Sequence, residues 1–260
     1  MPHSTETMTI DGAKIRVLRG GPEGAGAQPL VFLHGAGGHT GWMAFLEELS
    51  QRFAVYAPEH PGFGQSDDPS WLDGVGDLAY FYLDFLKTLG LERVHLVGTS
   101  LGGWIAAEMA VRDTARLASL TLVGAVGITA QGETIPDIFR MPVEENLRRF
   151  YADQERAARR VGDVAKADMR LVAKNQATVT RLAYWPRFYN PDLGKWLHRV
   201  DVPTLLIWGA EDGLVPPKFG EAYRSLIPGA KLTVLPAAGH APFDEQREAF
   251  LAAFSEFIAA

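Results

Sequence analysis

Seven short runs of aliphatic and β-branched residues recur along the chain. They cover residues 13–18, 29–34, 53–58, 93–98, 118–124, 202–208 and 230–235. Uninterrupted apolar runs of this length are typical of strands that are buried on both faces, as in a parallel sheet. The pattern therefore predicts a sheet built largely from these segments.

Between the predicted strands, apolar residues recur at the i, i+3, i+4 spacing of an amphipathic helix. These helical segments are 41–51, 71–88, 101–112, 218–226 and 244–258. Strands that alternate with helices predict a right-handed, mostly parallel α/β sheet with helices on both faces. The stretch 20–29 is rich in Gly, Ala and Pro and predicts a hairpin or loop between early strands.

One connection is far longer than the others. About 77 residues separate Gly124 from Val202, whereas a loop between strand and helix usually has roughly 2 to 6. The runs 143–160 and 163–185 within it have helical character. We therefore predict a helical cap inserted after the sixth strand. The predicted domains are the cap, 127–197, and the core, 1–126 with 198–260.

The composition is that of a folded globular protein. Of the 260 residues, 47% are hydrophobic and 22% are charged, which excludes disorder and fits one domain with an insertion. The net charge is −6 and no basic stripe is present, so nucleic acid is excluded as a partner. The absence of cysteine excludes disulfides, thiolate catalysis and zinc–thiolate or iron–sulfur sites.

Neither a metal nor a cofactor is expected, because the sequence has no H-x-x-H pair or other cluster of metal ligands. The N-terminal residues lack the basic flank and apolar run of a signal peptide. The longest apolar stretches are too short to cross about 30 Å of hydrocarbon. We expect no membrane span, a cytoplasmic location, and a monomer or homodimer.

The sharpest chemical signal is the pentapeptide Gly98-Thr99-Ser100-Leu101-Gly102. It follows a predicted strand and precedes a predicted helix, which is the setting that a G-x-S-x-G nucleophile elbow requires. Glycines on either side of the serine permit the tight turn that lifts its hydroxyl clear of the sheet. The alternative for Ser100 is an ordinary helix N-cap.

With this motif the sequence resembles the α/β-hydrolase superfamily, over essentially the whole chain. The family order is nucleophile, acid, histidine. Asp212 in Trp208-Gly209-Ala210-Glu211-Asp212 and His240 in Ala238-Gly239-His240 follow Ser100 in that order, each just past a predicted strand. The resemblance implies a mostly parallel eight-stranded sheet. It also favours Asp212 over its neighbour Glu211 as the acid that orients His240, the general base for Ser100.

The loop His34-Gly35-Ala36-Gly37-Gly38 follows another predicted strand and is similar to the family's oxyanion loop. The resemblance implies that the N–H groups of Ala36 and Leu101 stabilise the oxyanion of the tetrahedral intermediate. Gly37 is an alternative to Ala36. We expect His34 to orient the loop by hydrogen bonding rather than to transfer protons.

Aromatic residues of the predicted cap supply the other pocket candidates. Most of them are expected to form the core of the cap, and some to face the cleft as a water-poor lining. The predicted pocket residues are His34, Gly35, Gly37, Trp104, Phe139, Tyr184, Trp185 and Phe188.

A serine at the elbow argues against dehalogenases and epoxide hydrolases, which resemble this chain but use a carboxylate nucleophile. The first prediction is hydrolysis of a small to medium apolar carboxylic ester.

The alternative is cleavage of a carbon–carbon bond in a vinylogous diketone, in which Arg181 or Arg187 would bind the dienoate carboxylate. Two departures from the similar carbon–carbon hydrolases weaken this alternative. Those enzymes tend to have the loop H-G-G-G-P-G and a tryptophan soon after the catalytic histidine. Here the loop is HGAGGHT, and Ala241-Pro242-Phe243 follows His240.

Two further classes remain open for the same small-molecule pocket. One is a cofactor-free haloperoxidase or perhydrolase. The other is a ligand receptor without catalysis, since related folds can bind ligands without turning them over. An activated Ser100 would separate an enzyme from such a receptor.

Overall fold

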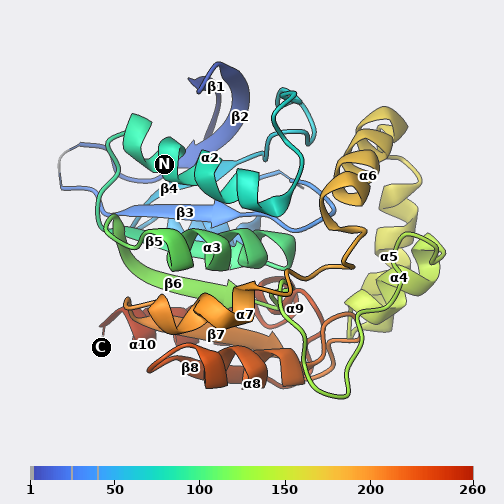
Figure 1. The fold of residues 1–260 in the computed structure, drawn as a ribbon. Helices are drawn as coiled ribbons and strands as arrows, with labels where there is room; N and C mark the ends of the chain where they lie inside the picture. Colours follow the sequence, from blue (N-terminus) through green and yellow to red (C-terminus); the bar gives the residue numbers. More distant parts are fainter. Residues whose placement is uncertain (1–2, 25, 40, 260) are drawn as a thin grey trace.

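The computed structural model describes residues 3–24, 26–39 and 41–259. Its centre is an eight-stranded sheet with the strand order β1-β2-β4-β3-β5-β6-β7-β8 (Figure 1). The strands are β1 (Ser4–Ile10), β2 (Ala13–Gly20), β3 (Pro29–Leu33), β4 (Ala54–Pro58), β5 (Val94–Thr99), β6 (Leu117–Val123), β7 (Thr204–Gly209) and β8 (Lys231–Leu235). The strands from β3 to β8 pair in parallel, and β2 pairs antiparallel with both β1 and β4. The predicted fold class is confirmed.

Strand β1 is not predicted by the pattern of apolar runs. Only every second residue of its C-terminal half, Glu6, Met8 and Ile10, is shielded from solvent. An edge strand that covers the core with one face needs alternation rather than an uninterrupted apolar run. The stretch 20–29 is a connection between β2 and β3, with Ala25 outside the described residues.

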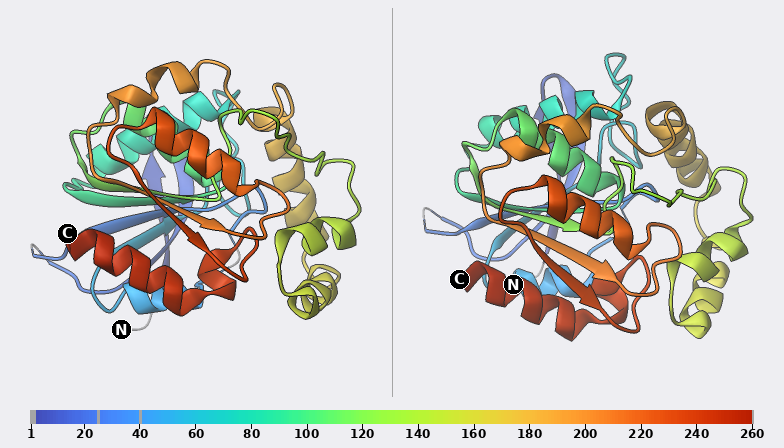
Figure 2. Two further views of the ribbon diagram at one scale, coloured as in Figure 1. Left: turned by 90° about the horizontal axis from the view of Figure 1, so that it is seen from below. Right: turned by 60° about the horizontal axis from the view of Figure 1, so that its bottom comes forward.

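Helices cover both faces of the sheet (Figure 2). One face carries α1 (Ala44–Leu49) and α10 (Arg247–Ala259), and the other carries α2 (Val75–Thr88), α3 (Leu101–Arg112) and α8 (Pro217–Leu226). Successive residues of a strand point to opposite faces. In β3, Val31 and Leu33 pack with α2 and α3, whereas Leu30 and Phe32 pack with α1 and α10.

The cap lies at the carboxyl ends of the parallel strands (Figure 1). Its helices are α4 (Val143–Phe150), α5 (Gln154–Val164) and α6 (Met169–Ala183). The following α7 (Leu193–Trp196) falls inside the predicted cap and the 3-10 helix η1 (Leu197–Arg199) begins at its last residue, but both pack on α3, with Leu193 and Leu197 in the main core. The chain rejoins the core near Tyr189, which forms a β-bridge with Gly127.

The helical run predicted over 143–160 is divided into two helices. The linker of residues 151–153 separates α4 from α5, and the Asp153 carboxylate caps α5 by accepting the N–H groups of Glu155 and Arg156. This linker leaves backbone groups of the cap free to contact the core.

Among residues 3–24, 26–39 and 41–259, no helix combines the length and apolar character that a membrane crossing requires.

Candidate active site

Ser100 sits at the sharp turn between β5 and α3 with φ 54° and ψ −115°. This left-handed φ is strained for a non-glycine residue, and its cost of roughly 1–3 kcal/mol is sustained by the surrounding structure. The Ser100 N–H donates to the Val123 carbonyl at 2.9 Å. Within the part of the chain that the structure describes, the Ser100 side chain makes no capping bond to α3, so the N-cap alternative is not supported.

Glycine is required on both sides of this turn. A Cβ at Gly98 would lie 2.3 Å from the Gly102 carbonyl oxygen, and a Cβ at Gly102 would lie 2.1 Å from the Leu33 carbonyl oxygen. The first residues of α3 therefore press directly against the ends of β5 and β3. The elbow predicted from the sequence is formed by core elements alone.

His240 and Asp212 form a buried hydrogen-bonded pair. The His240 Nδ1 atom lies 2.7 Å from Asp212 Oδ2, with both side chains almost completely inaccessible to solvent. The other carboxylate oxygen, Oδ1, accepts the N–H groups of Leu214 at 2.9 Å and Val215 at 2.8 Å. These three donors fix the carboxylate, and with the proton on Nδ1 the imidazole keeps Nε2 as its acceptor.

The end of strand β6 joins Ser100 to this pair. Val123 accepts the Ser100 N–H, and Val126 donates its N–H to the Ser100 carbonyl at 3.3 Å. Gly124 lies between them, and a Cβ there would be 3.1 Å from His240 Nδ1 and 3.4 Å from Asp212 Oδ2. Ser100, Asp212 and His240 therefore gather around residues 123–126 at the carboxyl edge of the sheet.

Glu211 has a different position from Asp212. Its side chain is exposed and lines a shallow surface pocket of about 300 Å³ with Ala152, Ala237 and Glu245. The buried carboxylate beside His240 belongs to Asp212.

The predicted oxyanion loop runs next to Ser100. A Cβ at Gly35 would lie 3.2 Å from Ser100 Cβ and 3.8 Å from its Oγ. The Gly38 N–H donates to the Gly35 carbonyl at 3.1 Å, which forms a turn with Ala36 and Gly37 at its centre. Ala36 is half-buried against the core whereas Gly37 is exposed. Leu101 is the first residue of α3, and N–H groups at this position have no partner within the helix.

His34 is part of a buried cluster beneath this loop. Its Nδ1 contacts the Gly35 carbonyl at 2.8 Å and its Nε2 accepts the His60 N–H at 3.0 Å. His60 in turn bonds the His34 carbonyl through Nε2 at 2.9 Å and Tyr82 through Nδ1 at 2.5 Å. These bonds tie the His34 side chain to the loop and to His60, and its role in orienting the loop stays a prediction.

Both imidazoles of this cluster are held neutral. Burial, followed by the neighbouring His60 and His39, lowers the pKa of His34 well below its usual value. Burial likewise lowers the pKa of His60 to about 3, and burial with the nearby Glu59 raises the pKa of Tyr82 well above its usual value. The cluster therefore carries no charge near neutral pH.

Helix α6 of the cap docks on the predicted oxyanion loop and on a second glycine-containing loop, residues 62–64. Asn175 donates to the Gly37 carbonyl at 3.2 Å and accepts the Gly64 N–H at 2.8 Å. Thr178 donates to the Gly62 carbonyl at 2.6 Å, and Lys174 donates to the Gly64 carbonyl at 2.9 Å. Sequence analysis does not single out these residues, because a polar stripe on a helix is equally typical of a solvated face.

The other end of the cap contacts the acid and histidine loops through its backbone. The Phe150 carbonyl accepts the His240 N–H at 2.6 Å, and the Arg149 carbonyl accepts the Gly213 N–H at 3.1 Å. The Phe150 ring also meets the His240 ring edge-on, with centroids 5.1 Å apart. These contacts are a second feature that sequence analysis misses.

The predicted pocket aromatics separate into different environments. Phe139 stacks on Phe188 with centroids 5.4 Å apart and meets Tyr184 edge-on at 5.5 Å. Trp104 is a core residue, 4% exposed, whose indole N–H donates to Glu108 at 3.0 Å. Trp185 is 89% exposed. Neither tryptophan is placed as a pocket wall, because one packs inside the core and the other projects into solvent.

The two cap arginines considered as carboxylate anchors are already paired. Arg181 binds Asp68 at 2.6 Å and Arg187 binds Asp137 at 3.1 Å. Across the described residues, no group of three or more His, Asp or Glu side chains is arranged to hold a metal ion.

Comparison with known proteins gives a consistent assignment. The model of the Alpha/beta hydrolase family matches residues 30–253. The chain belongs to the alpha/beta hydrolase family. A 2-hydroxy-6-oxononadienedioate/2-hydroxy-6-oxononatrienedioate hydrolase of Paraburkholderia phymatum is 30% identical, with 98% of each chain covered.

Two solved structures are similar to this alpha/beta hydrolase. A bacterial membrane phospholipase A has a TM-score of 0.83 and 26% identity, covering 99% of this chain and 87% of the other. A meta-cleavage product hydrolase from Pseudomonas fluorescens has a TM-score of 0.83 and 21% identity, covering 98% and 97%. The second likeness concerns the fold alone. Hydrolase chemistry is the activity that the family and these relatives share.

Proposed function

We propose that this alpha/beta hydrolase is a serine hydrolase whose catalytic triad is Ser100, His240 and Asp212. The observation that carries the proposal is the convergence of the elbow serine and the buried His240–Asp212 pair on residues 123–126. The N–H groups of Leu101 and Ala36 complete the site as the oxyanion hole. Loss of one such donor typically lowers the rate about 100 to 1000-fold.

The chemistry follows from these groups. The Ser100 oxygen attacks a substrate carbonyl carbon while His240 Nε2 takes the hydroxyl proton. The bond between the carbonyl carbon and the leaving group then breaks, and His240 delivers its proton to that group. Water attacks the resulting acyl-enzyme while His240 accepts a water proton, and His240 then returns that proton to the Ser100 oxygen as the carboxylic acid is released.

We infer that the bond cleaved is a carbon–carbon bond in a vinylogous diketone. Support comes from the full-length relative whose printed name is a 2-hydroxy-6-oxononadienedioate hydrolase, at 30% identity. The leaving group is then a stabilised dienolate, and its carbon accepts the proton from His240. This assignment replaces the carboxylic ester as the first candidate substrate.

Ester hydrolysis is the second candidate, and a specific observation supports it. Arg181 and Arg187, the cap cations considered for the dienoate carboxylate, are both bound to aspartates. A neutral ester needs no such cation. One structural neighbour, at 26% identity, is named a membrane phospholipase A, and phospholipases of this type cleave carboxylic esters.

The test compares two substrates on the same enzyme. We would measure kcat/KM for 2-hydroxy-6-oxo-6-phenylhexa-2,4-dienoate and for p-nitrophenyl butyrate, with wild type, Ser100→Ala and Ser225→Ala. Ser225 is a matched control, because it is exposed on α8, where its hydroxyl donates to the Ala222 carbonyl. We expect both activities to be lost in Ser100→Ala, to be retained in Ser225→Ala, and to be greater for the diketone in wild type.

Two outcomes would overturn parts of the proposal. Turnover that survives in Ser100→Ala would exclude the triad. A wild-type enzyme that hydrolyses the ester and leaves the diketone intact would exclude carbon–carbon cleavage and leave the ester as the substrate class.

A further inference from the structure

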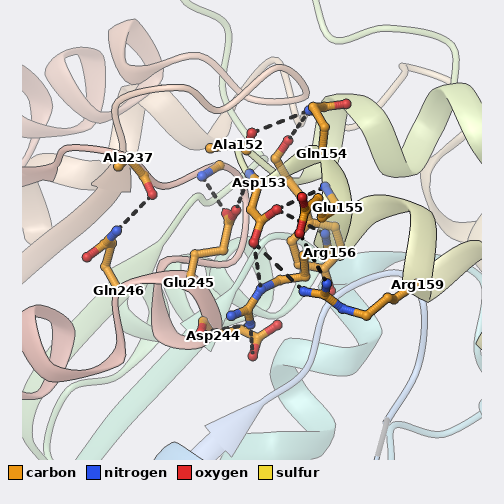
Figure 3. A network of polar contacts seen from close by, with 12 residues as sticks. Ala152, Asp153, Gln154, Glu155, Arg156, Arg159, Ala237, Asp244, Glu245 and Gln246 are labelled. Atoms are coloured by element: carbon orange, nitrogen blue, oxygen red, sulfur yellow. Dashed lines mark hydrogen bonds and ion pairs between the residues drawn. The ribbon is translucent and has the colours of Figure 1, made fainter.

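A network of polar contacts joins the cap to the loop that carries His240 (Figure 3). On the cap side lies the linker of residues 151–153 with the first turn of α5. On the core side lie residues 237–240 and the short helix α9 (Pro242–Glu245). The centre of the network is the Glu245 side chain, which points between the two segments.

Each oxygen of the Glu245 carboxylate accepts a different backbone N–H. Oε2 accepts the Gly239 N–H at 2.6 Å, and Oε1 accepts the Asp153 N–H at 2.9 Å. Gly239 directly precedes His240 in the chain, whereas Asp153 is the N-cap residue of α5. One side chain therefore bonds both the histidine loop and the cap.

Close packing also restricts the histidine loop, residues 237–240, in addition to these bonds. A Cβ at Gly239 would lie 2.3 Å from the Phe150 carbonyl oxygen and 2.8 Å from the Ala152 nitrogen. The next N–H along the chain, that of His240, donates to Phe150 at 2.6 Å. Two successive N–H groups of the loop are thus fixed, one by Glu245 and one by the cap backbone.

An ion pair holds α5 over the same region. Arg156 Nη1 lies 2.7 Å from the Asp244 carboxylate and 3.0 Å from the Asp244 carbonyl oxygen. Asp244 neighbours Glu245 on α9, so the cap helix and the Glu245 bridge are attached to one short element. The cap linker and α9 therefore enclose residues 239–240 from two sides.

We propose that Glu245 is a positioning residue that sets the orientation of His240 through Gly239 and couples that orientation to the cap linker. The inference rests on the proposed catalytic role of His240. The bridge requires an acceptor at both carboxylate oxygens of Glu245. A glutamine would present an NH₂ donor to one of the two N–H groups, so Glu245→Gln disrupts the bridge with almost no change in shape.

The test measures how fast a fluorophosphonate labels Ser100, because labelling reports activation of the serine without knowledge of the natural substrate. We expect Glu245→Gln to lower the second-order labelling rate about 10-fold or more, as for loss of a charge-assisted hydrogen bond. Glu245→Asp retains both oxygens on a shorter stem and is expected to fall between glutamine and wild type.

Two control variants remove similar groups without touching Gly239. Gln246→Ala loses a side-chain bond to the Ala237 carbonyl in the same loop, and Glu248→Gln loses one negative charge at an exposed position of α10. We expect both to label within about twofold of wild type. Equal labelling rates for wild type, Glu245→Gln and Glu245→Asp would overturn the inference.

Amide hydrogen exchange separates positioning from general destabilisation. In Glu245→Gln we expect faster exchange in residues 237–241 and in the linker 151–153, with unchanged exchange in the elbow, 98–104. Uniformly faster exchange in all three segments would overturn the positioning role. If wild type itself is not labelled at Ser100, the proposed function fails, whereas the exchange experiment still tests the Glu245 bridge.

Discussion

The two halves of the candidate active site are built in different ways. The nucleophile half consists of β3, β5 and α3, and its parts fit together because Gly98 and Gly102 let backbone atoms touch. The histidine half consists of the loops around Asp212 and His240, whose N–H groups at Gly213 and His240 bond the cap backbone. Ser100 is therefore placed by the core alone, whereas His240 is placed by core and cap together.

This difference separates stability from activation. Changes on the nucleophile side disturb the packed core and alter the free energy of unfolding. Changes on the histidine side or at the oxyanion loop leave the core intact and alter the rate of the chemical step. Four further variants or conditions test this division, beginning with the largest expected effect.

Asp212→Asn should have the largest effect on catalysis. The asparagine would turn an NH₂ group toward His240 and favour the tautomer whose Nε2 already carries a proton. We expect kcat to fall about 10,000-fold with little change in KM. Glu211→Gln, one residue earlier and exposed, is the control and should retain activity within about twofold. A large loss in Glu211→Gln instead would reassign the acid.

Gly102→Ala should destabilise the core on the nucleophile side. The added methyl would lie 2.1 Å from the Leu33 carbonyl oxygen, so urea denaturation should show a loss of about 1–3 kcal/mol. The matched change is Gly162→Ala in α5, where a Cβ meets no atom of the described chain within 4 Å beyond its own part of the helix. There we expect a gain of about 0.5–1 kcal/mol. Equal effects at the two sites would contradict the tight elbow.

Asn175→Ala should slow catalysis without unfolding the core. The variant loses the bond to the Gly37 carbonyl and frees the turn that holds Ala36. We expect kcat to fall about 10-fold, less than the loss of an oxyanion donor itself, with a small change in the melting temperature. Gln176→Ala, at the next and exposed position, is the control. Unchanged kcat in Asn175→Ala would show that α6 does not position the loop.

The buried His60 should make stability depend on pH. Its pKa is lowered to about 3 in the folded protein, whereas an unfolded histidine has a pKa near 6.5. The unfolded chain therefore binds the extra proton first, so stability is full above about pH 6.5 and falls between about pH 6.5 and 3.

Urea denaturation between pH 7.5 and 4.5 measures this effect. His60 alone should contribute about 1.4 kcal/mol per pH unit below its unfolded pKa. His60→Asn should reduce the slope by that amount, while the exposed His198→Asn should not. An identical slope in His60→Asn and wild type would contradict the neutral buried imidazole.

The sequence by itself determined the fold class and predicted the residues of the candidate site. Ser100, Asp212 and His240 each follow an apolar run that becomes a buried parallel strand. Because the carboxyl ends of parallel strands lie at one edge of the sheet, a linear pattern was enough to bring the three together. The same reasoning predicted the oxyanion loop after β3.

The tertiary structure alone decided how the cap holds these loops. The helical pattern of 143–160 does not reveal the linker at 151–153, because its interruption is stabilised by contacts with Gly239 and Glu245. Asp153 and Glu245 are 92 residues apart, and Gly37 and Asn175 are 138 apart. Periodicity registers only near neighbours in the chain, whereas these hydrogen bonds exist once packing has brought distant backbone groups within 3.5 Å.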